Sequence, residues 1–200
     1  MFTGYHDITR RPKAEHHGPV TTAQIDYELW ELIRIYDDLE PLTVLEIGSQ
    51  WGGTLYYWLE GAADGATIAN IDILQGMSEA DKVALPKQWR SWRPVGVELH
   101  TFIGRSDDPA IFEQVFSVMP EIDFLFIDAV HTYEGAKHDF EKYGALVRPG
   151  GVIALHDLVT PSFSPHIQVG KLWREIQEAG YMTREIRAGA DYGGIGVVFA

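Results

Sequence analysis

Two short apolar segments of this chain each end in side chains that could bind a metal ion or accept a proton. The first reads IDFLFID and ends in Asp128, three residues before His131, and the second reads GVIALHD and ends in His156 and Asp157. Carboxylate and imidazole groups are common metal ligands and general acids or bases. Because an unpaired buried charge is costly, these groups need a metal, a substrate or each other as partners. If both segments are strands of one open α/β sheet, they end at the edge where such sheets bind ligands.

A glycine-containing loop follows the first apolar strand and is a second candidate for ligand binding. From Glu46 the chain reads EIGSQWGG, so Gly48 and Gly52 stand where the backbone could turn sharply and approach a ligand. The dinucleotide fingerprint G-x-G-x-x-G requires a glycine where this chain has Gln50. Glu46 would also repel a pyrophosphate. Both features argue against NAD and favour a ligand with a cationic end.

A carboxylate also ends the second predicted strand. Asp72 lies 24 residues after Gly48, near the ~20 residues expected between a glycine loop and an acid that accepts ribose hydroxyls. The alternative is a solvated acid at a strand end. Because the acid and the glycine loop occur together, we favour the ribose role for Asp72.

These side chains must be positioned by an alternation of apolar strands and amphipathic helices, which predicts a mostly parallel sheet built from βαβ units. Thr21 and Thr22 could cap the first helix, Pro41 ends it, and a Pro-Gly-Gly turn precedes the fifth strand. The runs FLFI and VIAL suit central strands that are covered on both faces. The predicted strands are 43–49, 66–73, 97–104, 122–129 and 151–157, the predicted helices are 23–38, 54–60, 79–90, 108–118, 133–147 and 168–179, and 183–189 with 193–200 form a terminal hairpin.

Composition narrows the class of protein and its partners. The 200 residues contain 46% hydrophobic residues, which suits one domain over 21–200 preceded by a polar arm over 1–20. The absence of cysteine excludes disulfides, thiolate metal sites and cysteine nucleophiles. A net charge of −13 argues against nucleic acid or an anionic membrane as partner and favours a small-molecule substrate. No segment is typical of a signal peptide or a membrane span, so we expect a cytoplasmic protein, and a homo-oligomer stays open.

The strand–helix units followed by a hairpin resemble the Rossmann-like α/β sheet of class I S-adenosylmethionine-dependent methyltransferases, which has seven strands and an antiparallel last strand. The E-x-G-x-x-x-G pattern that begins at Glu46 resembles motif I of these enzymes. The resemblance implies that Glu46, Gly48 and Gly52 approach the methionine and ribose parts of S-adenosylmethionine. It also implies that Gly104 and Ser106 border the adenine, although the segment around Ser106 could equally serve only as the cap of the next helix.

The strand that ends in Asp128 carries the pattern I-D-x-x-H-x-Y, and the later pair His156-Asp157 follows a Pro-Gly-Gly sequence. This combination resembles the methyltransferase 24 family, which includes relatives of macrolide sugar O-methyltransferases and of the enzyme called cephalosporin hydroxylase. Catechol-type O-methyltransferases hold a divalent metal with an Asp after strand four and an Asp-Asn pair after strand five. By resemblance, Asp128 and Asp157 bind such a metal, Asp128 also borders the cofactor, and His131 is the candidate base. His156 is a third metal ligand or only orients its neighbour.

The expected activity is therefore methyl transfer from S-adenosylmethionine to a hydroxyl of a sugar, natural product or similar small molecule, with a divalent metal assisting. Mg²⁺ prefers oxygen ligands, and an imidazole ligand leaves Mn²⁺, Fe²⁺ or a metal-free site open. Other enzymes on the same fold, such as aminopropyl transferases and hydroxylases, and a non-catalytic cofactor-binding domain are the alternatives. The loop 158–168 is expected to shape the acceptor pocket, and the N-terminal arm and first helix could form a lid.

Overall fold

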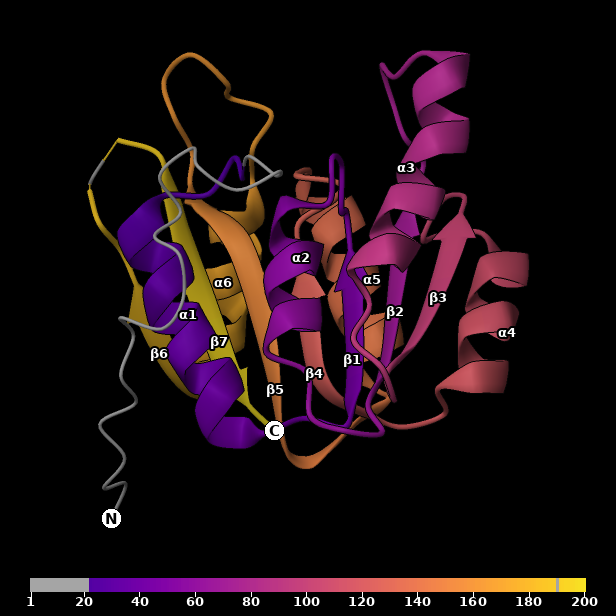
Figure 1. Cartoon of the computed structure of the whole chain (residues 1–200). Helices are drawn as coiled ribbons and strands as arrows, with labels where there is room; N and C mark the ends of the chain where they lie inside the picture. Colours follow the sequence, from indigo (N-terminus) through magenta and orange to yellow (C-terminus); the bar gives the residue numbers. More distant parts are fainter. Residues whose placement is uncertain (1–21, 190) are drawn as a thin grey trace.

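The computed structural model describes residues 22–189 and 191–200, and its centre is a seven-stranded sheet (Figure 1). The strand order is β3-β2-β1-β4-β5-β7-β6, and among the described strands β7 alone runs in the direction opposite to the others. The predicted mostly parallel sheet with an antiparallel terminal hairpin is confirmed. The strands are β1 (Thr43–Ile47), β2 (Thr67–Asp72), β3 (Glu98–Ile103), β4 (Ile122–Ile127), β5 (Val147–Val159), β6 (Met182–Ile186) and β7 (Gly193–Phe199).

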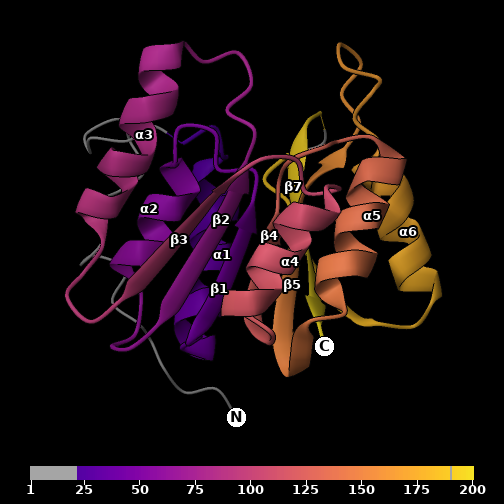
Figure 2. The same cartoon turned by 90° about the vertical axis from the view of Figure 1, so that its right-hand side faces the viewer.

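Helices cover both faces of the sheet (Figures 1 and 2). One face carries α1 (Asp26–Leu39), α2 (Gly53–Glu60) and α3 (Glu79–Trp92), and the other carries α4 (Pro109–Val118), α5 (Tyr133–Gly144) and α6 (Val169–Glu178). Alternate residues of each strand enter opposite cores: Phe124 and Phe126 of β4 pack with α1–α3, whereas Leu125 and Ile127 pack with α4–α6. This double burial explains why the central strands are apolar at successive positions.

The first helix begins later than predicted. α1 starts at Asp26, and its N-cap residue Ile25 makes no side-chain hydrogen bond, so the predicted cap by Thr22 is wrong. Residues 22–25 instead run past the end of the sheet, where the Nε2 atom of Gln24 donates a hydrogen bond to Asp128. Thr21 and the predicted arm, residues 1–20, lie outside the described residues.

The predicted Pro-Gly-Gly turn is part of strand β5. The strand begins at Val147, and its pairing with β4 shifts register between Ile122 and Phe124, as in a β-bulge. Gly150 has a φ of +81°, which suits glycine within this irregular stretch. Arg148, next in the chain to Val147, pairs with the Asp123 carboxylate of β4 and so ties the two strands together at the edge opposite their carboxyl ends.

A buried carboxylate joins the N-terminal helix to the C-terminal hairpin. Glu28 of α1 is fully buried, and its two oxygens accept hydrogen bonds from the main-chain N–H groups of Ala188 and Gly194, each at 2.8 Å. This contact holds the start of α1 beside Tyr192 and the start of β7. Within the described residues, no helix has the length and apolar character that a membrane crossing needs.

Candidate active site

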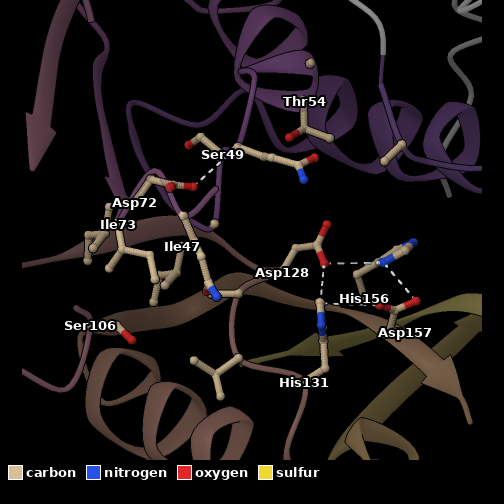
Figure 3. Close-up of a pocket in the computed structure, with 18 of the residues that line it drawn as sticks. Ile47, Ser49, Thr54, Asp72, Ile73, Ser106, Asp128, His131, His156 and Asp157 are labelled. Carbon is tan, nitrogen blue, oxygen red and sulfur yellow. Dashed lines mark hydrogen bonds and ion pairs between the residues drawn. The ribbon is translucent and has the colours of Figure 1, made fainter. Parts of the chain in front are cut away.

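A cavity of about 400 Å³ opens at the carboxyl ends of the strands (Figure 3). Its wall includes the ends of β1 to β5, residues 22–25 and the start of β7. The helix after β1 lies on one face of the sheet and the helix after β4 on the other, so the chain diverges between these adjacent strands. Such a divergence point is where open α/β sheets place their ligands.

Two glycines shape the loop after β1 for different reasons. Gly48 has a φ of +94° and lines the cavity, and a Cβ atom there would overlap the main-chain carbonyl of Asp128. Gly52 has a φ of +87° and begins α2, and a Cβ atom there would overlap the indole of Trp89. Gly52 is not part of the cavity wall. Gly48 therefore serves the close approach of β1 to β4, and Gly52 the packing of α2 against α3.

Glu46 lies one layer behind the cavity wall. Its side chain is fully buried and accepts hydrogen bonds from the Ser49 hydroxyl at 2.5 Å, from the Thr54 hydroxyl and from the Trp58 indole N–H at 3.0 Å. Ser49 and Thr54 line the cavity, whereas Glu46 does not. Burial raises the pKa of Glu46 to about 7, although its three donors favour the ionised form. Direct contact of Glu46 with a cofactor stays a prediction.

Asp72 faces the cavity from the end of β2. Its Oδ2 atom accepts a hydrogen bond from the main-chain N–H of Gln50 at 2.6 Å, and its Oδ1 atom accepts one from the main-chain N–H of Leu74. The carboxylate is therefore fixed by two loops while part of its acceptor capacity is left for a ligand.

The segment after β3 both borders the cavity and caps the next helix, the two roles between which the sequence did not decide. Gly104 and Ser106 line the cavity, while Asp108 caps α4 by accepting a hydrogen bond from the N–H of Ala110 at 2.8 Å. The main-chain oxygen of Ser106 accepts a hydrogen bond from the hydroxyl of Tyr143 at 2.8 Å. The cap is thus supplied by the second acid after Ser106, which leaves Ser106 on the wall.

Two carboxylates and two imidazoles meet at the ends of β4 and β5 (Figure 3). The Nε2 atom of His131 lies 3.2 Å from Asp128 Oδ1 and 3.3 Å from Asp157 Oδ2. The Nδ1 atom of His156 lies 3.4 Å from Asp128 Oδ1 and 3.4 Å from Asp157 Oδ1. Each imidazole therefore contacts both carboxylates. The structure brings together all four residues that the sequence placed at these strand ends.

A distortion of β5 lets two successive residues join this cluster. Successive side chains of a regular strand point to opposite faces, so His156 and Asp157 could not both face it. Asp157 has a φ of +64°, and the pairing of β5 with β7 shifts register between His156 and Val159. A left-handed backbone is strained for an aspartate, and such strain is concentrated at functional positions.

The charges of the cluster compensate one another. Burial alone would raise the pKa of Asp128, but His156 and His131 hold it well below its usual range. Burial alone would lower the pKa of His156, yet the two carboxylates raise it to about 10. The hydrogen bond to Asp128 raises the pKa of His131 above its ordinary value, against the effect of its own burial. At neutral pH the His156 imidazole therefore carries its proton between the two carboxylates.

Comparison with known proteins agrees with this geometry. A family model described as a methyltransferase domain, Methyltransf_24, matches residues 45–158. The chain belongs to the methyltransferase 24 family. That span contains the glycine loop, Asp72 and all four residues of the cluster. The family match and the order of the strands in the sheet both confirm the predicted class I methyltransferase fold.

Solved structures with the same fold are O-methyltransferases, although their sequences are distant. The O-methyltransferase from Bacillus cereus, in complex with S-adenosylhomocysteine, is 21% identical with a TM-score of 0.65, over 91% of this chain and 84% of that one. TomG from Streptomyces achromogenes, involved in tomaymycin synthesis and in complex with S-adenosylmethionine, is 18% identical with a TM-score of 0.62, over 89% and 82%. An uncharacterized protein of Acanthamoeba polyphaga mimivirus is 27% identical over 162 residues, 80% of this chain and 72% of the viral one.

The cluster of this family member has a donor set that fits a divalent cation. Asp128, His131 and Asp157 each offer one ligand atom, and these atoms all lie within 4.8 Å of one another. Two carboxylate oxygens and one imidazole nitrogen suit Mn²⁺ or Fe²⁺ better than Mg²⁺, which prefers oxygen ligands. His156 lies beside this group, with 7% of its surface exposed and no aligned hydrogen bond to either ring nitrogen. The predicted ligand set of Asp128, His156 and Asp157 stays a prediction, and the geometry favours His131 as the third ligand.

Sequence reasoning missed Gln24 and the burial of Asp139. The Nε2 atom of Gln24 donates to Asp128 Oδ2 at 2.7 Å, which leaves Oδ1 toward the histidines. No motif signals this contact, because it joins positions 104 residues apart. Asp139 of α5 is 1% exposed, and its burial raises its pKa. No described residue of the loop 158–168 lines the cavity.

Gly48→Ala tests whether the approach of β1 to the end of β4 is a packing constraint. Gly65→Ala is the matched control, because Gly65 also has a positive φ, +81°, but a Cβ atom added there would meet no other atom within 4 Å. We expect Gly65→Ala to lower the free energy of unfolding by about 1–2 kcal/mol through backbone strain alone. Gly48→Ala should cost roughly 1–3 kcal/mol more, because of overpacking against Asp128. Equal losses in urea unfolding would contradict the packing argument.

Proposed function

We propose that the protein is an S-adenosylmethionine-dependent O-methyltransferase that acts on a hydroxyl of a small molecule such as a sugar or natural product. The observation that carries the proposal is the layout of one cavity. The carboxylate of Asp72 stands on one side of it, and the Asp128 cluster stands at the ends of the two strands beyond β1. Family membership and the O-methyltransferase fold support the same activity.

The cofactor would bind across the ends of β1, β2 and β3. Asp72 would accept the ribose hydroxyls, because it is already held by two main-chain N–H groups. Gly104 and Ser106 would border the adenine, and Gly48 would let the backbone approach the ligand. Asp128 would then lie between the cofactor and the acceptor, since it follows the strand next to β1. This arrangement places the methyl donor toward the ends of β4 and β5.

The acceptor hydroxyl would meet the cluster at His131. The His131 side chain is 32% exposed, compared with 16% for Asp128 and 18% for Asp157. During transfer the acceptor oxygen bonds to the methyl carbon as the carbon–sulfur bond breaks, and the hydroxyl proton must go to a base. A divalent cation bound by Asp128, His131 and Asp157 would favour the ionised hydroxyl. Nε2 of His131 is therefore either a metal ligand or the site that receives this proton.

Calorimetric titration with S-adenosylmethionine and with NAD tests the cofactor class. We expect S-adenosylmethionine to bind and NAD not to, because Gln50 replaces the glycine that a pyrophosphate requires and Glu46 lies beneath the loop. Transfer of a labelled methyl group to a panel of hydroxyl acceptors then tests the reaction. Binding of NAD alone would contradict the proposal. Cofactor binding without transfer to any acceptor would favour a non-catalytic domain, and transfer from decarboxylated S-adenosylmethionine would favour an aminopropyl transferase.

Mn²⁺ binding, measured by electron paramagnetic resonance, tests the metal site. Asp128→Asn and Asp157→Asn should each weaken Mn²⁺ binding by at least about tenfold, because each removes a charged ligand. Asp107→Asn is the matched control, since Asp107 lines the same cavity but pairs with Arg105 outside the cluster. Unchanged binding in both cluster variants would contradict the metal assignment. His131→Ala separates the roles of the imidazole: a ligand weakens Mn²⁺ binding, whereas a base lowers transfer alone.

A further inference from the structure

The two oxygens of the Asp128 carboxylate have different partners. The Oδ1 atom lies 3.2 Å from Nε2 of His131 and 3.4 Å from Nδ1 of His156 (Figure 3). The Oδ2 atom accepts a hydrogen bond from Nε2 of Gln24 at 2.7 Å. The terminal torsion of an aspartate side chain is broad, so a carboxylate keeps one orientation only where its partners hold it. Gln24 supplies the partner on the Oδ2 side.

Gln24 belongs to a segment that is anchored to the terminal hairpin. Residues 22–25 line the cavity and lead directly into α1. Four residues after Gln24, the buried carboxylate of Glu28 accepts hydrogen bonds from the main-chain N–H groups of Ala188 and Gly194. The hairpin lies beyond β5 in the sheet, next to the strand that carries half of the cluster. The glutamine is therefore held from a part of the fold that lies outside the loops of the cavity.

The amide of Gln24 has one satisfied end and one unsatisfied end. Because the histidines hold the pKa of Asp128 well below its usual range, the carboxylate is ionised and can only accept hydrogen bonds. The amide must therefore present Nε2 to Asp128 and turn Oε1 elsewhere. The Oε1 atom is buried, and none of the described groups donates a hydrogen bond to it. An unsatisfied buried acceptor costs free energy, so stability alone does not explain this glutamine.

We propose that Gln24 is a positioning residue for the reaction, whose amide fixes the carboxylate of Asp128 so that Oδ1 faces the histidines and any cation that the cluster holds. The inference rests on the proposed function, in which Asp128 lies between the cofactor and the acceptor. Gln24 precedes residues 45–158, which match the family model. The contact therefore joins the family motif to a segment of the chain outside it.

Imidazole ¹⁵N NMR spectra of the metal-free protein at neutral pH test this role without any ligand. Gln24→Met keeps an unbranched side chain but removes the donor, so the Asp128 carboxylate can rotate and its contacts with both imidazoles change. We expect the resonances of His131 Nε2 and His156 Nδ1 to shift from their wild-type values. Gln75→Met is the matched control, because Gln75 lines the same cavity but is exposed and follows β2. Unshifted resonances in Gln24→Met would overturn the proposal.

Urea unfolding separates positioning from a structural role. Gln24→Met loses one hydrogen bond but also removes the unsatisfied oxygen, and these two effects oppose each other. We expect the unfolding midpoint to stay at its wild-type value. Glu28→Gln should lower the midpoint, because it turns an amide donor toward a main-chain N–H group of the hairpin. A midpoint that falls as far in Gln24→Met as in Glu28→Gln would show a structural role and contradict the proposal.

Mn²⁺ binding, measured by electron paramagnetic resonance, extends the test to the loaded cluster. Gln24→Met should weaken Mn²⁺ binding by about tenfold, as is typical when a group that orients a metal ligand is removed. In the Asp128→Asn background the same substitution should have no further effect, because the carboxylate that Gln24 positions is gone. In the Asp157→Asn background it should still weaken binding. Equal effects in the two backgrounds would overturn the proposal.

The outcomes are distinguishable from those of the proposed function. Absence of Mn²⁺ binding by the wild type would contradict the metal assignment, and the imidazole spectra and the unfolding midpoint would then decide the role of Gln24. Absence of methyl transfer to any acceptor would contradict the proposed function itself. Wild-type Mn²⁺ binding and wild-type methyl transfer in Gln24→Met, even with shifted resonances, would overturn this inference alone, because the orientation of Asp128 would then have no consequence for the site.

Discussion

The close packing of β1 against the end of β4 is the constraint on which the site depends. The N–H of Asp128 donates to the main-chain oxygen of Ile47 at 2.8 Å, and the absence of a side chain at Gly48 lets the next loop turn over the Asp128 carbonyl. This contact lies at the point where the helices after the two strands go to opposite faces. It therefore joins the half of the cavity that carries Asp72 to the half that carries His131, and it sets their separation before any ligand binds.

The two halves of the cavity stabilise a buried carboxylate in different ways. Asp128 is compensated by its own neighbours, because His131 and His156 lie beside its Oδ1 atom and hold its pKa well below the usual range. Glu46 receives only neutral donors, and burial raises its pKa to about 7. A cluster whose carboxylates are balanced by its own imidazoles suits chemistry on an uncharged hydroxyl, with or without a cation in the cluster. An uncompensated carboxylate suits the binding of a ligand that brings its own positive charge.

The sheet and most of the cluster could be predicted because their signals are local. Apolar runs reveal central strands, and the polar residues that end them must gather at one edge when the strands are parallel. Long-range contacts carry no such signal. Gln24 reaches Asp128 across 104 residues, and Glu28 binds the hairpin amides of Ala188 and Gly194, so neither appears in a motif. The burial of Asp139 has no sequence signal either, because periodicity alone does not reveal which neighbours cover a helix position.

The most direct test of this cofactor placement is the structure of a complex with S-adenosylhomocysteine. We predict that the ribose hydroxyls lie on the carboxylate of Asp72, that the ammonium group lies beside Ser49 and Thr54, and that the sulfur faces Asp128 across the end of β1. The acceptor side, with His131, should then remain open to a small molecule. A ligand whose ribose lies away from Asp72, or whose sulfur faces away from the cluster, would contradict the assignment of the two halves of the cavity.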